Sequence, residues 1–441
     1  MSDRQPIGLP SLLRRLNTAD ILREIRSNGP MSRTSIANAT GLSQVTVNQI
    51  ARRLRKAGHV VEERGDEASG HSCRRGRKIS LLRFNAASGY VLGIDIAPRA
   101  VVVLVAELNG KIIAEERRRV VAIGQLHPNP LLALVRTAAQ AALARARVPH
   151  SAIKAAGIGV PGRVDPSSGR ISLAPALPGW DGLIVGRLPL RSLDCPIVVE
   201  NDMHLAMLAE RGFGSAKAVD NAVYLHLGVG IGLGILVHGE LYTGPAGAAG
   251  EIAFIPVCST EETPEGNFGT FEWAAGSTAF ERLGRRAAAS SPGGLIQELA
   301  GGDFSRIDAR VVVEAASQGD AGAAAVLSEV VKQLARGICA VQCVLDPSTI
   351  ILGGEVSRAG FLLLERLNAE IQRITRPPVG RIVVSPLGDE VVALGAVQAA
   401  LNHVDERIFT VVPQDRFSYR TNRHVSNSQT SFVRAQPRGG I

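Results

Sequence analysis

The sequence predicts an α/β protein in which a small, basic, mainly helical head precedes a larger body of alternating strands and helices. The first 85 of the 441 residues hold 16 lysines and arginines but only 7 aspartates and glutamates, and this excess equals the chain's net charge of +9. Hydrophobic residues make up 45% of the chain and aromatic residues 4%, which favours a large aliphatic core. Because the hydrophobic periodicity changes near residue 85, we predict domains at residues 1–84 and 85–402 and a polar, flexible or loosely docked tail at 403–441.

The head is predicted to contain three short helices within residues 17–62. Ser32 can cap the second helix, and Ser43 can cap the third, which runs over residues 44–56. Gly41 lies in the short turn between these two helices and permits a positive φ there. Two helices joined by a three- to four-residue turn with a glycine form the helix-turn-helix pattern.

The third helix separates an apolar face from a polar one. Val47, Ile50 and Leu54 share one face and are predicted to be core. Polar side chains elsewhere on such a helix can reach base edges, and arginine suits phosphate or guanine. We therefore predict DNA contacts from Ser43, Gln44, Thr46, Asn48, Gln49 and Arg52. The alternative is a plain helical hairpin whose polar face is only solvated.

A predicted wing follows the third helix. An extended segment at 59–61 leads to a polar loop, then to the basic run at 74–78, and then to a second strand at 79–84. Arginines in such a loop can enter a narrow minor groove. The sequence therefore predicts a winged helix-turn-helix, with DNA contacts from Arg74, Arg75 and Arg77. As a bare charge run, this segment would more often be a solvated loop.

Composition also limits the class of protein. No apolar run reaches the roughly 18 residues of a membrane span, and no signal-peptide pattern opens the chain, so we expect a cytoplasmic protein with no membrane partner.

The cysteines are odd in number and widely spaced, and none forms a Cys-x-x-Cys pair, which favours neither a disulfide framework nor a zinc site. They are Cys73, Cys195, Cys258, Cys339 and Cys343.

The body is predicted to repeat one pattern, three strands followed by alternating helix and strand. Strands are expected at 90–96, 101–107, 111–121, 153–160, 197–200, 223–227, 235–237, 349–352 and 382–384. Helices are expected at 131–147, 202–211, about 320–345, 361–375 and 390–402.

Five motifs then occur in order, and with them the chain resembles the ROK family of bacterial repressors and sugar kinases over residues 17–402. The resemblance implies a two-lobed, actin-like or RNase-H-like (sugar kinase) body with a sugar bound between the lobes. The motifs are Gly157-Ile158-Gly159-Val160-Pro161-Gly162, Glu200-Asn201-Asp202, Gly228-Val229-Gly230-Ile231-Gly232-Leu233-Gly234, Gly247-Ala248-Ala249-Gly250-Glu251 and Ile351-Leu352-Gly353-Gly354-Glu355.

The first phosphate loop departs from the family pattern. Sugar kinases of the family have Asp-x-Gly-Gly-Thr after the first strand, with glycines that let backbone amides approach phosphate. This chain keeps Asp95 but has Ala97 and Pro98 in place of the glycines, and Pro98 has no amide hydrogen. We therefore expect no ATP binding, no cofactor and no enzymatic activity.

The family's metal site departs as well. Phe254 stands where a histidine ligand is expected, and no cysteine lies between Cys258 and Glu272. Tetrahedral zinc needs four nitrogen or sulfur ligands, so we predict no metal. Ala176 stands where the family often has a sugar-contacting asparagine.

The resemblance implies a ligand site made by Asn201, Asp202, Glu251 and Glu272. Carboxylates accept pairs of sugar hydroxyls in charge-assisted hydrogen bonds. The alternative for each residue is a structural one: a surface carboxylate or a helix cap. Asp202 in particular could be the N-cap of the helix at 202–211.

These features lead to one leading hypothesis and two alternatives. The leading one is a transcriptional repressor of carbohydrate-related genes that binds a double-stranded DNA operator as a homodimer or higher homo-oligomer. A sugar or sugar-phosphate effector would shift the body between two closures. The first alternative is an active ATP-dependent ROK sugar kinase with an appended DNA-binding head. The second is a DNA-binding protein whose empty cleft serves dimerisation.

Overall fold

The computed structural model describes most of the head and the body. The described residues are 9–65, 79–185, 195–256, 264, 266, 268–375 and 378–409. The predicted wing contacts Arg74, Arg75 and Arg77, the tail from residue 410, and most of the stretch between Cys258 and Glu272 lie outside them.

The head contains the predicted helix-turn-helix and a small antiparallel sheet. Ser32 Oγ accepts the Ser35 amide hydrogen at 3.0 Å, Ser43 Oγ accepts that of Thr46 at 3.2 Å, and Gly41 has a φ of 68°. The first helix starts earlier than expected, and the first strand was not anticipated, because its two residues are ordered only by pairing with β3. The elements are α1 (Leu9–Asn28), β1 (Met31–Ser32), α2 (Arg33–Thr40), α3 (Gln44–Lys56), β2 (Val60–Gly65) and β3 (Ile79–Phe84).

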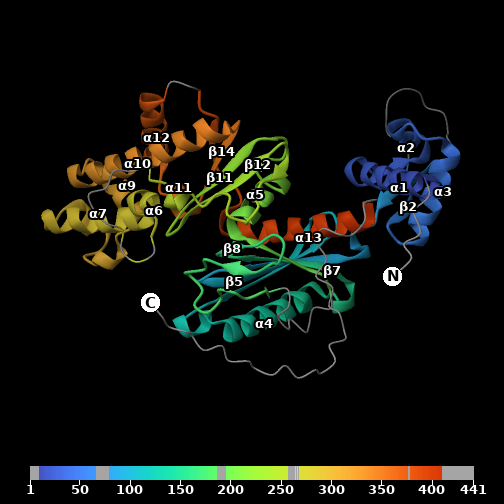
Figure 1. Ribbon diagram of the computed structural model, residues 1–441, viewed down its shortest axis with the longest axis horizontal. Coiled ribbons are helices and arrows are strands. Elements are labelled where there is room, and N and C mark those ends of the chain that lie inside the picture. The colour runs from blue at the N-terminus through green and yellow to red at the C-terminus, as the bar shows by residue number, and fades with distance from the viewer. Residues whose placement is uncertain are drawn as a thin grey trace, which may run out of the picture. The chain divides into compact units, whose positions relative to one another are not determined.

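The body contains two five-stranded sheets of the same topology, as the repeated pattern predicted (Figure 1). The sheet orders are β10-β7-β4-β5-β6 and β15-β14-β11-β12-β13, so in each sheet three antiparallel strands are followed by two parallel ones. The first comprises β4 (Tyr90–Ile96), β5 (Ala100–Glu107), β6 (Ile112–Arg119), β7 (Ile153–Val160) and β10 (Ile197–Asn201). The second comprises β11 (Ala222–Leu227), β12 (Ile231–Val237), β13 (Glu240–Leu241), β14 (Thr349–Gly353) and β15 (Arg381–Val384), while β8 (Arg163–Val164) pairs with β9 (Ile171–Ser172).

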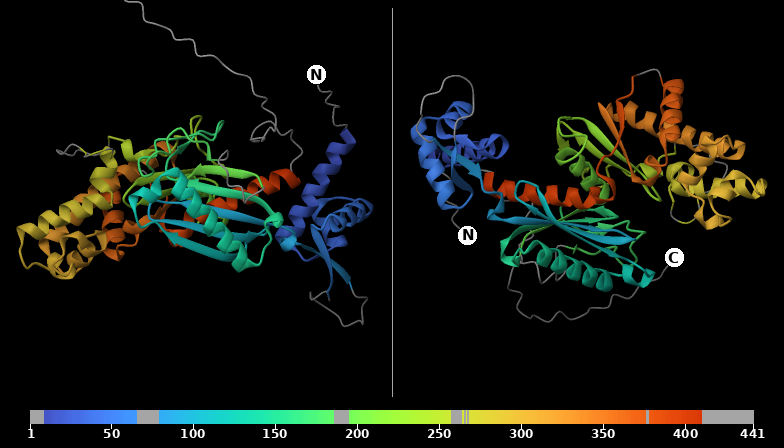
Figure 2. Two further views of the ribbon diagram at one scale, coloured as in Figure 1. Left: turned by 90° about the horizontal axis from the view of Figure 1, so that it is seen from below. Right: turned by 180° about the vertical axis from the view of Figure 1, so that it is seen from behind.

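Helices cover these sheets. One face of the first sheet packs on α4 (Pro128–Ala146) and the other on α13 (Val391–Phe409), a layering visible in Figures 1 and 2. The second sheet packs on α5 (Asp202–Gly212), and α5 packs on α13. The remaining helices are α6 (Thr270–Ala275), α7 (Ser277–Ser290), α8 (Leu295–Leu299), α9 (Ala309–Ser317), α10 (Ala321–Leu345), α11 (Gly354–Ser357) and α12 (Phe361–Ile374).

Two glycines allow α13 to lie close against the first sheet. A Cβ on Gly93 would lie 2.3 Å from the carbonyl oxygen of Ala393, and one on Gly157 would lie 2.0 Å from that of Ala396. Because such contacts are shorter than any van der Waals contact, only glycine fits at these strand positions. Gly157 therefore serves helix packing, although it belongs to one of the five motifs that carry the family resemblance.

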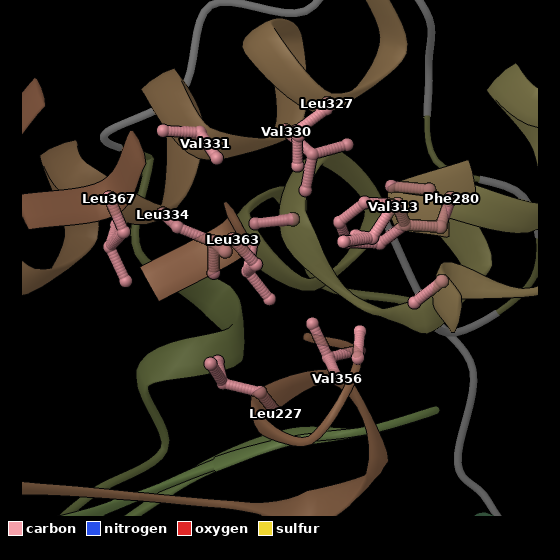
Figure 3. Packing of buried hydrophobic residues seen from close by; sticks show 14 of the residues in the cluster. Leu227, Phe280, Val313, Leu327, Val330, Val331, Leu334, Val356, Leu363 and Leu367 are labelled. Atoms are coloured by element: carbon pink, nitrogen blue, oxygen red, sulfur yellow. The ribbon is translucent and has the colours of Figure 1, made fainter. Parts of the chain in front are cut away.

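The core of the second half of the body is mainly helical. Phe280 from α7, Val313 from α9, Leu334 from α10 and Leu363 from α12 converge in one cluster above Leu227 of β11 (Figure 3). Each is at most 3% exposed. Full burial of such a side chain contributes about 1.5–3 kcal/mol, so this cluster holds these helices against the second sheet.

The last helix is longer than expected. It ends at Phe409 and not at residue 402, so the first seven residues of the predicted tail are helical. Asp405 in this added turn accepts hydrogen bonds from Arg26 of α1 at 2.6 and 2.7 Å. The polar composition of this stretch concealed a helix whose end is stabilised by a partner 379 residues away in the sequence. None of the helices within the described residues is long and apolar enough to cross a membrane.

Candidate functional site

Helix α3 presents the predicted polar face. Val47, Ile50 and Leu54 are at most 3% exposed, as the periodicity predicted. Ser43, Gln44, Gln49 and Arg52 are exposed, whereas Thr46 and Asn48 are half-buried. None of the six predicted residues, which are the N-cap Ser43 and five residues of the helix, belongs to the buried face. Their DNA contacts stay a prediction.

One residue of this helix was missed in the sequence. Val45 is 67% exposed between Gln44 and Thr46, at the start of the helix. An exposed aliphatic side chain among polar ones at this position can pack on a thymine methyl group in the major groove. The signal was present, because Val45 does not share the face of Val47, Ile50 and Leu54.

Two arginines of the head share one carboxylate. Glu62 on β2 binds both Arg33 and Arg55. The hydrogen bond from Arg33 is the main reason that the pKa of Glu62 falls to about 2. These cations are partly neutralised, so the exposed Arg52 is better placed to meet a phosphate.

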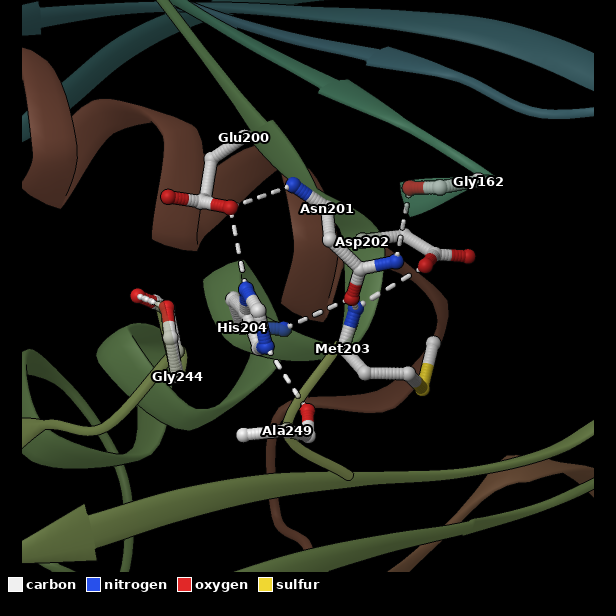
Figure 4. Close-up of polar contacts among 9 residues, drawn as sticks. Gly162, Glu200, Asn201, Asp202, Met203, His204, Gly244 and Ala249 are labelled. Carbon is white, nitrogen blue, oxygen red and sulfur yellow. Dashed lines mark hydrogen bonds and ion pairs between the residues drawn. The ribbon is translucent and has the colours of Figure 1, made fainter. Parts of the chain in front are cut away.

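The candidate ligand site of the body lies where β10 passes into α5. Asn201, and not Asp202, is the N-cap: its Oδ1 accepts amide hydrogens from Met203 at 2.8 Å and His204 at 3.2 Å. Its Nδ2 donates to the Gly162 carbonyl at 3.0 Å. The structural role proposed as an alternative for Asp202 therefore belongs to Asn201, and both polar atoms of Asn201 are occupied within the protein (Figure 4).

Asp202 has one carboxylate oxygen that is available to accept a hydrogen bond from a ligand. Its Oδ1 accepts the Met203 amide hydrogen at 3.0 Å, while its other oxygen points away from the residues drawn in Figure 4. Burial raises the pKa of Asp202 to about 7. Asp95, at the end of β4, has a pKa raised to about 8, first by burial and then by the charge of Asp202. Near neutral pH this pair of carboxyls therefore carries both hydrogen-bond donor and acceptor capacity.

Glu251 and Glu272 differ in how they are held. Glu272 ties α6 to the glycine-rich turn, since its Oε1 faces the Ile231 amide at 3.2 Å and its Oε2 the Gly269 amide at 3.3 Å. No described residue hydrogen-bonds the half-buried carboxylate of Glu251. Burial raises the pKa of both, and each is affected by nearby charges: Glu272 by Glu251, and Glu251 by His204 and Arg163. Of the four predicted ligand residues, Asp202 and Glu251 are thus the two that keep a carboxylate oxygen with no hydrogen bond from a described residue.

A histidine that the sequence did not reveal bridges the segments that carry Asp202 and Glu251. His204 Nδ1 is 2.9 Å from Glu200 Oε1, and His204 Nε2 is 3.0 Å from the Ala249 carbonyl oxygen (Figure 4). The available signal was the spacing of four residues between Glu200 and His204 across the helix start. The bridge ties the Glu200-Asn201-Asp202 segment to the loop that ends at Glu251.

The two segments at the positions of the family's phosphate loops, 95–99 and the glycine-rich 228–234, have structural uses here. The Ala97 amide donates to the Ala100 carbonyl at 3.1 Å in the tight turn between β4 and β5, and Pro98 has no amide hydrogen. Gly232 and Gly234 lie within β12, where a Cβ would meet Met203 of α5 at 2.5 and 2.4 Å. These glycines thus leave room for α5, and residues 228–230 form the turn between β11 and β12.

Residues at the expected metal site also have definite positions. Phe254 ends a short 3-10 helix (Ile252–Phe254) and is 49% exposed. Ala176, at the position of the expected asparagine, is exposed and offers no polar group. The described residues contain no cluster of three or more histidine, cysteine or acidic side chains arranged to hold a metal.

Comparison with known proteins agrees with this architecture. Residues 91–403 match the model of the ROK family, and residues 15–61 match that of a winged helix-turn-helix DNA-binding domain. The chain is 27% identical to the xylose repressor of Caldicellulosiruptor bescii over 400 residues, which cover 90% of this chain and 98% of the repressor. It is 32% identical to the glucokinase of Thermotoga maritima over 249 residues, which cover 54% of this chain and 77% of that enzyme.

A solved structure extends the likeness to the whole fold. The crystal structure of a ROK family transcriptional regulator, a homolog of the E. coli MLC protein, superposes with a TM-score of 0.73 at 22% identity, covering 90% of this chain and 98% of the other. The family model spans well over half of the chain, and the winged helix-turn-helix precedes it. The chain therefore belongs to the ROK family, in the branch whose members carry an N-terminal winged helix-turn-helix.

Proposed function

We propose that this protein is a DNA-binding transcriptional repressor whose operator affinity is controlled by a sugar. The single observation that carries the proposal is the pairing of two sites in one chain: the polar face of α3 and the carboxylates of Asp202 and Glu251. A helix face of this kind reads base edges, and carboxylates with free oxygens bind vicinal hydroxyls.

The effector class follows from the chemistry of the body site. Two carboxylates suit a neutral polyol better than an anion, because a sugar phosphate would bring a like charge toward them. An unphosphorylated sugar is therefore the first candidate, and D-xylose is the first probe because a relative that aligns over 90% of the chain is a xylose repressor.

We also propose that the protein is not an enzyme. Support comes from the turn between β4 and β5, where the Ala97 amide is already bonded and Pro98 has none to offer a phosphate. The specific observation in favour of a kinase is the alignment with a glucokinase over 54% of the chain. A coupled assay for ADP release with D-xylose, D-glucose and N-acetyl-D-glucosamine separates the two, since turnover near 1 s⁻¹ is ordinary for an enzyme.

Helix α13 offers a physical connection between the two sites. It packs on α5, which begins with Asp202, and its Asp405 binds Arg26 of α1 in the head. A ligand that favours one position of α5 over another can therefore bias the head through one rigid helix. In a homodimer, the same shift would change the separation of two heads on two operator half-sites.

The test measures DNA binding and its response to sugar in the same assay. Duplexes selected from a random library by the full-length protein serve as operators, and fluorescence anisotropy reports affinity with and without each of the three sugars. We expect nanomolar binding that one sugar weakens at least tenfold. A protein that selects no sequence, or binds its selected sequence equally with every sugar, would contradict the proposal.

A further inference from the structure

The buried histidine at the start of α5 lies between two hydrogen-bond acceptors, so both of its ring nitrogens are placed to donate a hydrogen. His204 is 2% exposed, and each of its ring nitrogens faces an oxygen: Glu200 Oε1 at 2.9 Å and the Ala249 carbonyl at 3.0 Å. A carbonyl oxygen can only accept, and the same Glu200 oxygen also accepts the Asn201 amide hydrogen at 2.8 Å. A neutral imidazole has one donor and one acceptor, whereas an imidazolium has two donors.

The histidine holds the segment that carries Glu251. Ala249 lies two residues before Glu251, and its amide donates to the Thr243 carbonyl at 3.1 Å. The Leu233 amide donates to the Gly250 carbonyl at 3.1 Å, and a Cβ on Gly250 would lie 1.9 Å from the Leu233 oxygen. This segment is therefore fixed on one side by β12. On its other side, His204 holds it through the Ala249 carbonyl (Figure 4).

We propose that His204, as an imidazolium, is a positioning residue that sets the separation of Asp202 and Glu251 and thereby the affinity of the site for a sugar. This inference rests on the proposed function. In the neutral ring, one of the two nitrogens would have no hydrogen to donate to the oxygen that it faces. If that nitrogen is Nε2, the hydrogen bond that links the Ala249–Glu251 segment to α5 is lost.

The charges around His204 support the ionised form. Burial by itself lowers the pKa of His204, but the hydrogen bond and charge of Glu200, together with the Ala249 carbonyl and the charge of Asp202, raise it overall. Glu251 faces it from the loop, and its own pKa is lowered by the charge of His204. From β10, α5 and the loop, the titratable groups facing His204 are thus all acidic: Glu200, Asp202 and Glu251.

The arrangement has a pH signature. Sugar binding through an ionised Asp202 should strengthen as the pH rises through about 7, the pKa of that carboxyl. Deprotonation of His204 should then weaken binding at higher pH. The affinity therefore passes through a maximum, with a rising limb from Asp202 and a falling limb from His204.

The first experiment needs no ligand. In full-length protein with ¹⁵N-labelled histidine, the ring signals of His204 are identified among the nine histidines by their absence in His204→Gln. We expect both ring nitrogens to be protonated at pH 7. A neutral ring in one tautomer throughout pH 6–8 would overturn the inference, whatever the sugar data show.

The second experiment measures D-xylose affinity by calorimetry from pH 6 to 9, with D-glucose and N-acetyl-D-glucosamine as further probes. We expect the parent affinity to fall about tenfold on the alkaline limb, and His204→Gln to bind weakly at every pH without that limb. His204→Lys restores a donor cation and should recover binding while moving the falling limb to higher pH. An alkaline limb that persists unchanged in His204→Gln would refute the positioning role.

The matched control is His226→Gln. His226 on β11 is also a histidine with an enclosed ring, but its Nδ1 has no hydrogen-bond partner among the described residues, and burial lowers its pKa to about 4. The same substitution there should leave the pH profile intact, and a profile altered as in His204→Gln would show a general packing effect and overturn the assignment. If no sugar binds the parent at any pH, the proposed function fails while the first experiment still decides the state of His204.

Discussion

Replacing Asp202 with asparagine should weaken sugar binding and at the same time stabilise the ligand-free protein. Asparagine keeps the Oδ1 acceptor that binds the Met203 amide at 3.0 Å and removes the charge. The pKa of Asp202 rises from 3.8 to about 7 in the folded protein because the carboxyl is buried. At 1.36 kcal/mol per pKa unit, this corresponds to a ceiling of roughly 4 kcal/mol against the ionised form.

The sign of the pH dependence follows from the raised pKa. The Asp202 carboxyl holds its proton more tightly in the folded state than in the unfolded one. The stability that this proton contributes is therefore fully present below about pH 4 and is lost as the pH rises to about 7. The parent loses up to about 1.4 kcal/mol per pH unit across this window, and Asp202→Asn does not. The advantage of the variant should therefore grow between pH 5 and 7 and stay constant above that.

Urea unfolding of both proteins at half-unit steps from pH 5 to 8.5 measures the difference in free energy of unfolding. Asp220→Asn is the control, because the Asp220 side chain is 72% exposed and its charge costs little on folding. Parallel stability curves for the parent and Asp202→Asn would refute the reasoning. They would mean that ionisation of Asp202 does not lower the free energy of unfolding, so that burial does not raise the pKa of this carboxyl.

Three further outcomes are expected. Gly157→Ala should lower the free energy of unfolding in urea by about 1–3 kcal/mol, as overpacking does, since its Cβ would lie 2.0 Å from the Ala396 carbonyl oxygen. The control is Gly124→Ala, whose Cβ would have no described atom within 4 Å and which should leave the free energy of unfolding nearly unchanged. Arg75→Ala and Arg77→Ala should each lower the slope of log operator affinity against log salt by about 0.9, and an unchanged slope would make the wing run a solvated loop. Gln44→Ala, Asn48→Ala and Val45→Ala should relax base preference in a selected-library assay with the salt slope intact, and equal losses on all sequences would count against direct readout.

Much of the head could be predicted because its signals are local. A serine before a helix, a glycine in a turn and apolar residues at helical spacing act within a few residues of themselves. The caps at Ser32 and Ser43 and the buried face of α3 were accordingly confirmed. The duplicated strand order of the body was also readable, since strand and helix periods repeat along the chain.

The same local reading failed where a distant partner decides the structure. Strand β1 exists because β3 pairs with it, and the end of α13 carries a carboxylate that Arg26 binds. The motif glycines at 157, 232 and 234 look alike in sequence, but their use in admitting α13 and α5 depends on which helix lies against them.

The division is sharpest at the candidate site. The family resemblance was enough to select Asn201, Asp202, Glu251 and Glu272 as ligand candidates, and carboxylates are groups that accept sugar hydroxyls in charge-assisted hydrogen bonds. Only the folded chain separates their roles: Asn201 caps α5, Glu272 holds α6, and Asp202 and Glu251 keep free oxygens. It also brings Asp95 beside Asp202 and places His204 between two acceptors, which no local pattern records. Titration behaviour and hydrogen-bond partnership depend on burial and distance in three dimensions, and these are properties of the tertiary structure.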